Sequence, residues 1–200
     1  MPYDYSEAPP QRELIPANTV ATCCLHIQGG GAGEGGMLKL SRDGHCAMLS
    51  LEITLLDGEF AKRKLWENWI VEGVDRARAI EISRSRIKAV LDSALGLDPK
   101  DVSPQARAAR TKSYKELEGL NFLGKIGIEK GAPKNDGSGE SWPDKNILAA
   151  IITPDRREWH PVVQPPPFNG GGPTTPGSTT PSGAAPPTST PPITRPGWAS

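Results

Sequence analysis

The chain has 200 residues, and its 23 basic and 23 acidic side chains cancel to a net charge of zero. Such a balance disfavours a protein that coats nucleic acid through a broad positive surface, although a local basic groove stays open. No apolar run is long enough to span a membrane, and the N-terminus lacks the basic and apolar regions of a secretory signal. With three cysteines and no CxxC spacing, we expect a soluble protein of a reducing cytoplasm.

The two ends of the chain differ in composition from its middle. Residues 161–200 contain 12 of the 21 prolines, 6 of the 22 glycines and a single charged residue, Arg195. A segment that cannot bury apolar surface cannot offset its ordering entropy, so this segment is predicted to be a disordered tail. Residues 1–18 are polar and interrupted by prolines, which indicates an N-terminal arm. One folded domain is therefore expected over residues 19–160.

The first half of this domain has the pattern of β-structure. An uncharged, β-branched first strand is followed by a loop with six glycines in residues 29–36. The third predicted strand alternates apolar and polar residues, and Asp57-Gly58 marks a hairpin turn after it. The predicted strands cover residues 19–27, 37–41, 46–56 and 63–71.

The period changes to that of a helix after residue 74. Asp75 is the predicted N-cap and Gly96 the predicted end, and Ser103-Pro104 opens a second, short helix. Two further strands are predicted at 121–130 and 146–153, with a polar loop between them. The order predicts a mainly β fold: a five-stranded OB-fold-like barrel with a helix between strands three and four. Another small Greek-key barrel and an α+β sandwich are the alternatives.

Motifs for catalysis and cofactor binding fail in their context. Gly31-x-Gly33-x-x-Gly36 has the spacing of a dinucleotide fingerprint, but a predicted strand follows it where the motif needs a helix. Cys23 and Cys24 point to opposite faces of a strand, so we interpret them as buried structural cysteines and not as metal ligands. No catalytic motif is present. We therefore predict no enzymatic activity, no cofactor and no metal.

Aromatic residues interleaved with basic ones are the remaining signal. Strand alternation places Lys64, Trp66 and Asn68 on one face and Trp69 on the other. An exposed ring beside cations suits single-stranded nucleic acid, because bases stack on rings while phosphates pair with cations. The alternative is that both tryptophans belong to the core. A second group surrounds the predicted loop between the last two strands and consists of Lys130, Lys134, Trp142 and Lys145.

Several segments resemble a phage and prophage family of single-stranded-DNA-binding proteins of OB type. The resemblance covers roughly residues 12–160 and rests on Leu14–Thr19, Leu56–Asn68, Ala79–Ile87, Leu120–Phe122, Ile126–Lys130 and Asp144–Asn146. It implies a role in DNA recombination or replication in the bacterial host cytoplasm, beside a phage recombinase, exonuclease or primase. Many single-strand-binding proteins end in an acidic tip that recruits partners. This chain ends instead in Pro192–Ser200, so such recruitment is not expected.

Two hypotheses follow for the function. In the first, the protein binds single-stranded DNA without sequence preference. Trp66 and Trp142 would then stack bases, while Arg63, Lys64, Lys125, Lys130 and Lys145 would hold phosphates. In the second, an OB-like module docks a recombinase or nuclease without touching DNA, which the zero net charge favours. No membrane partner is expected, and a homo-oligomer is left open.

Overall fold

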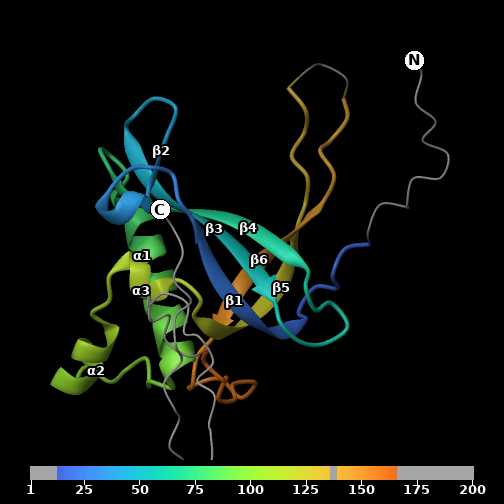
Figure 1. The fold of residues 1–200 in the computed structure, drawn as a ribbon. Coiled ribbons are helices and arrows are strands. Elements are labelled where there is room, and N and C mark those ends of the chain that lie inside the picture. The colour runs from blue at the N-terminus through green and yellow to red at the C-terminus, as the bar shows by residue number, and fades with distance from the viewer. Residues whose placement is uncertain (1–12, 136–138, 166–200) are drawn as a thin grey trace, which may run out of the picture. The chain divides into compact units, whose positions relative to one another are not determined.

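The computed structural model describes residues 13–135 and 139–165 (Figure 1). Residues 166–200 of the predicted tail lie outside these ranges, as do residues 1–12 of the predicted arm. Residues 161–165 are described, and the Gln164 side chain donates to the carbonyls of Ala94 at 3.0 Å and Asn121 at 2.8 Å, so the folded domain extends beyond the predicted boundary at residue 160. The fold is mixed α/β, with an antiparallel sheet of six strands in the described ranges and a long helix after the fourth strand. The strands are β1 (Val20–Gln28), β2 (Lys39–Leu40), β3 (Cys46–Leu55), β4 (Lys64–Gly73), β5 (Asn121–Glu129) and β6 (Lys145–Ile152). Their positions confirm the strands predicted from the sequence to within a few residues.

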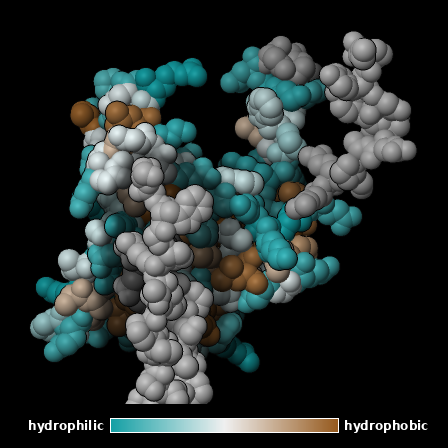
Figure 2. Space-filling model, viewed as in Figure 1, coloured by the Kyte–Doolittle hydropathy of each residue, from teal (hydrophilic) through white to brown (hydrophobic). Residues whose placement is uncertain are grey.

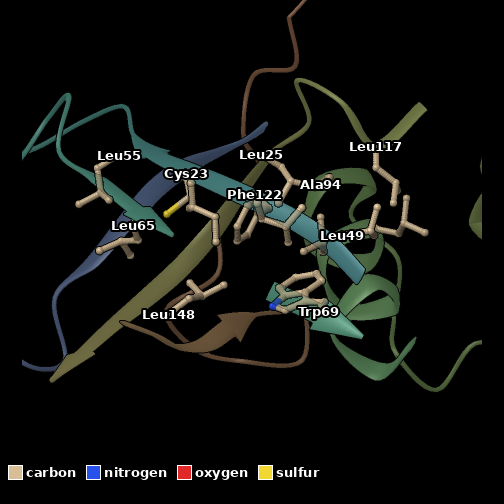
Figure 3. Close-up of a cluster of buried hydrophobic side chains, with 14 of the residues drawn as sticks. Cys23, Leu25, Leu49, Leu55, Leu65, Trp69, Ala94, Leu117, Phe122 and Leu148 are labelled. Carbon is tan, nitrogen blue, oxygen red and sulfur yellow. The ribbon is translucent and has the colours of Figure 1, made fainter. Parts of the chain in front are cut away.

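The sheet is built around β3 and β1. β3 pairs with β4 on one side and with β1 and the short β2 on the other, while β1 also pairs with β5, and β5 with β6. Every second side chain of β3 points into the core. These side chains are Leu49, Leu51, Ile53 and Leu55, and each is at most 1% exposed. Figure 3 shows Leu49 close to the helix, near Ala94 and Trp69, and Leu55 at the other end of the cluster beside Cys23 and Leu65. Hydrophobic burial between sheet and helix therefore positions the strands.

The expected closed barrel does not form, because the sheet stays open between β4 and β6. A carboxylate lies at this opening in place of a backbone ladder. Glu67 of β4 accepts the N–H of Leu148 in β6 at 3.0 Å and the indole N–H of Trp69 at 2.7 Å. Its second oxygen also pairs with Arg86 of the helix. The residue that did not fit the apolar pattern of its strand thus connects two strands and a helix.

The helices follow the predicted boundaries in part. α1 (Ala77–Leu95) ends at Gly96, whose left-handed φ of 68° confirms the predicted stop. The prediction that Asp75 caps this helix is wrong. The N-cap position is Arg76, no side chain caps it, and Asp75 has a φ of 56° in the preceding turn. α2 (Pro104–Arg110) begins as predicted, with the Ser103 hydroxyl accepting the N–H of Ala106 at 3.2 Å.

A short helix, α3 (Tyr114–Leu117), was not predicted. It begins with a capping box, in which Glu116 accepts the backbone N–H of Ser113 at 2.8 Å. The pattern Ser-x-x-Glu was visible in the sequence, but four helical residues are too few to show a helical period.

A buried ion cluster joins α1 to α2. Asp92 is 1% exposed and accepts from Lys88 at 2.7 Å and from Arg110 at 2.6 Å. Arg110 also donates to the carbonyl oxygens of Asp98 at 2.8 Å and Asp101 at 2.5 Å. The cluster therefore holds the loop between the two helices through one carboxylate and one guanidinium.

The end of the predicted arm belongs to the core. Ile15 is 0% exposed, and its N–H and carbonyl oxygen both bond to the side chain of Asn146 at 2.8 Å. Asn18 donates to the carbonyl of Ile126 at 2.8 Å. Residues 13–18 are thus fixed against β5 and β6, and the prediction of a separate arm is wrong for this part. Two adjacent apolar residues, Leu14 and Ile15, in a polar stretch have no period that reveals which of them is buried.

Candidate nucleic-acid interface

The side chains of β4 alternate between solvent and core as predicted. The exposed set is Lys64, Trp66 and Asn68, and the buried set is Leu65, Trp69 and Val71. Trp66 is 65% exposed, whereas Trp69 is 3% exposed and lies among buried leucines (Figure 3). The alternative that both tryptophans are core residues is therefore wrong, and Trp66 presents an indole ring to solvent.

The surroundings of Trp66 come from three neighbouring strands. Trp66 lies opposite Glu52 of β3, which in turn lies opposite His26 of β1. Lys64 donates to one oxygen of Glu52 at 2.6 Å, and Gln28 to the other at 3.3 Å. The hydrogen bond from Lys64 lowers the pKa of Glu52 below its ordinary value, so this carboxylate is ionised beside the ring at neutral pH.

A hairpin extends from β5 and β6 and carries the second exposed tryptophan (Figure 1). The Trp142 side chain is 61% exposed, and the Lys134 ammonium lies 5.7 Å from the centroid of its ring. The backbone N–H of Trp142 donates to the carbonyl of Ala132 at 2.9 Å. A side chain at Gly131 would bring its Cβ within 1.6 Å of the Trp142 carbonyl oxygen. Only glycine therefore allows the two hairpin segments to approach this closely.

Every lysine predicted to hold phosphate is paired with a carboxylate. The pairs are Lys64–Glu52 at 2.6 Å, Lys125–Glu158 at 3.3 Å, Lys130–Asp144 at 2.6 Å and Lys145–Glu129 at 2.9 Å. Arg63 donates to the carbonyl of Glu13 at 2.8 Å. The bond from Lys130 also lowers the pKa of Asp144, so that pair is ionised at neutral pH. Exposed pairs of this kind contribute only about 0–1 kcal/mol, so a phosphate can compete for the cation.

The structure brings together some of the predicted residues but not all. Arg63 and Lys64 are near neighbours of Trp66 in the chain, and Lys130 and Lys145 flank the hairpin of Trp142. Lys125 lies opposite Val20 at the start of β1, whereas Trp66 is level with His26 near its other end. Six residues of strand correspond to roughly 20 Å. Lys125 is therefore not part of the Trp66 surface.

Some exposed cations without a salt bridge were not among the residues predicted to hold phosphates. In the described part of the chain, Arg76, Arg78 and Arg84 are exposed at or near the start of α1 and form no salt bridge. The signal that could have found them is the excess of 12 basic over 7 acidic residues in 61–112. Figure 2 shows one face of the molecule as largely hydrophilic, with hydrophobic residues in small separate groups.

The cysteines are buried, as predicted. Cys23 is 0% exposed and Cys24 8% exposed, and burial raises the pKa of the Cys23 thiol to about 12. A thiol with so high a pKa is a poor nucleophile and metal ligand. Over residues 13–135 and 139–165, no three His, Cys, Asp or Glu side chains are grouped so that they could hold a metal ion.

No protein-family model, curated protein or solved structure matches the chain at a significant level. The resemblance to phage single-stranded-DNA-binding proteins therefore stays a prediction. None of the helices in the described ranges is both long and apolar enough to cross a membrane.

Proposed function

We propose that this protein binds single-stranded DNA without regard to its base sequence and has no catalytic activity. The observation that carries the proposal is the indole of Trp66, 65% exposed in the middle of a hydrophilic strand face. Large rings are normally at least half buried, because exposing them forgoes hydrophobic burial. A ring held in solvent by a rigid sheet is suited to stacking against a base.

The strand order supports this proposal. A first strand between β3 and β5, and a helix between β4 and β5, are features of the OB fold, which is a partly open barrel. OB folds bind oligonucleotides on the face of their second and third strands and with the loops 1–2 and 4–5. Counting the long strands, those positions correspond here to β3, β4, the glycine-rich loop and the hairpin. Trp66 is on β4 and Trp142 on the hairpin.

Single strands are favoured over duplex because their bases are free to leave the helix stack. Each base that stacks on an indole contributes about 1–3 kcal/mol, and the two rings can act on separate bases of one strand. The lysines beside the rings exchange a carboxylate for a phosphate, which gives a modest electrostatic gain. The protein would act in phage recombination or replication in the host cytoplasm, beside a recombinase, exonuclease or primase.

One observation favours a second candidate, an OB-like module that docks a recombinase or nuclease without contacting DNA. The lysines predicted to hold phosphates are all neutralised by carboxylates, so the surface offers little net positive charge to a polyanion. Exposed tryptophans are also frequent in protein interfaces.

Fluorescence anisotropy separates the two candidates. The probes are a mixed-sequence oligonucleotide of about 20 nucleotides, longer than the site of one OB fold, and the same sequence as duplex. We expect the single strand to bind at least about tenfold more tightly at low salt, since two stacking contacts exceed that ratio. Equal affinities, or no binding at low salt, would contradict the proposal and favour the docking module.

A further inference from the structure

Glu52 is at the centre of a small polar surface on three strands. Trp66 is opposite it on β4 and His26 on β1, while Ser50 and Thr54 are its neighbours on the same face of β3. Directly opposite residues have Cβ atoms about 4.5–5.5 Å apart. A base stacked on Trp66 therefore has its edge within reach of the Glu52 carboxylate.

This surface has groups that can recognise a base, and its lysine is paired with the central carboxylate. The charge of Lys64 is matched by Glu52, and His26 bonds to Glu118 at 2.8 Å. Ser50, Thr54, Gln28 and Asn68 are uncharged. A base that stacks on Trp66 therefore meets uncharged hydrogen-bonding side chains and one carboxylate on this surface.

The carboxylate can accept further hydrogen bonds. Its two oxygens offer about four acceptor positions, because an ionised carboxylate only accepts. The contacts from Lys64 and Gln28 use one on each oxygen, and the Glu52 side chain is still 17% exposed. Cytosine, adenine and guanine each bring an amino group to such an acceptor. Thymine and uracil bring an N–H flanked by two carbonyl oxygens, which a carboxylate repels.

We propose that Glu52 makes the Trp66 surface selective for bases with an exocyclic amino group over thymine and uracil. This inference rests on the proposed function, since it concerns the base that stacks on Trp66. It adds a local preference at one position to a strand that is otherwise bound without regard to sequence.

Homopolymers test the inference directly. Oligo-dC, oligo-dT and oligo-dU of about 20 nucleotides are titrated at about pH 7.5, where cytosine is neutral and Glu52 ionised. The dC and dU bases have the same size and differ in the amino or oxo group at C4 and in the proton at N3, and dT controls for the methyl group. We expect dC to bind about fivefold more tightly than dU and dT, the scale of one good contact to a base edge.

Two variants assign the preference to the residue. Glu52→Gln keeps the shape but can donate as well as accept, so the three affinities should become about equal. Glu129→Gln is the matched control, because it also removes a carboxylate paired with a lysine, on the hairpin, and should keep the preference. The inference is overturned if dT or dU binds as well as dC, or if Glu52→Gln retains the preference. Absence of binding to all three oligonucleotides and to the mixed sequence would overturn the proposed function itself.

Discussion

Two carboxylates that each pair with a lysine show how burial decides the role of an ion pair. Asp92 is 1% exposed and bonds to Lys88 and Arg110, which also holds the loop between α1 and α2. Glu52 pairs with Lys64 at a similar distance, but on the outer face of the sheet beside an exposed tryptophan. Water and salt screen the second pair more strongly than the contact between Asp92 and Arg110, whose side chains are 1% and 12% exposed. The buried pair therefore serves the fold, whereas the exposed pair can exchange its partner for a ligand.

The largest effect is expected at the buried pair. Asp92→Ala leaves Arg110 and Lys88 without their carboxylate, and breaking a buried pair on one side costs about 3–5 kcal/mol. We expect a loss of that size in the free energy of unfolding, measured in urea, with unchanged affinity for single-stranded DNA below the melting temperature. A loss under about 1 kcal/mol would mean that Asp92 is no more important than a surface carboxylate.

The two tryptophans of β4 allow the same comparison between a buried and an exposed side chain, here for aromatic rings. Trp69→Ala removes a buried ring and should cost about 3–5 kcal/mol of stability. Trp66→Ala should leave melting nearly unchanged and weaken single-strand binding by about 1–3 kcal/mol. Paired melting and anisotropy experiments on both variants measure this difference. If both variants only melt early, the binding surface lies elsewhere, and Trp142→Ala is the next variant to test.

Glu67 is intermediate, because it is mostly buried but lies at the open side of the sheet. Glu67→Ala leaves the indole N–H of Trp69 and the backbone N–H of Leu148 without their acceptor. An unsatisfied buried donor costs about 1–3 kcal/mol, so we expect a destabilisation of about that size in urea unfolding. Glu67→Gln keeps an acceptor and should lose less. Equal losses for the two variants would show that the acceptor is unimportant and that charge alone matters.

Substitutions in exposed ion pairs should change the affinity for DNA and hardly change the free energy of unfolding. Asp144→Asn still accepts the N–H of Gly131 but releases Lys130 to a phosphate. Stability should change by less than about 1 kcal/mol. Binding to single strands should tighten, and the slope of log K against log salt should steepen by about one. Asp155→Asn, which affects no predicted phosphate-binding lysine, is the control and should change neither quantity.

The smallest effect is expected at the capping box of α3, and it depends on pH. The backbone N–H of Ser113, with Lys112 and the Ser113 hydroxyl, lowers the pKa of Glu116 from 4.5 to about 2. A lowered pKa in the folded state means that the stabilisation is present above pH 4.5 and is lost as the pH falls toward 2. In the Glu116→Gln variant, the difference between the urea midpoints at neutral and at acidic pH should therefore be smaller than in the unchanged protein. Glu81→Gln, at an exposed glutamate without a salt bridge in the described ranges, should not.

Features that depend on a few consecutive residues could be read from the sequence alone. Alternation in β3 and β4 predicted the strands and placed Trp66 and Trp69 on opposite faces, because each strand residue points opposite to its neighbour. Gly96 and Ser103 predicted helix ends, because a cap acts within one turn. Alternation left open whether both rings were buried, and the structure shows that Trp66 faces solvent.

Only the tertiary structure decided which groups meet across the chain. Ile15 is buried against a residue 131 positions away, and Lys125 is paired with Glu158 across 33 positions. Glu67 is a charged residue on the core-facing side of β4, and its role is evident only from the contacts with Leu148 and Arg86. The predicted phosphate-binding lysines looked free for the same reason. A local period records which way a side chain points, but its partner is set by packing between distant segments, which leaves no period in the sequence.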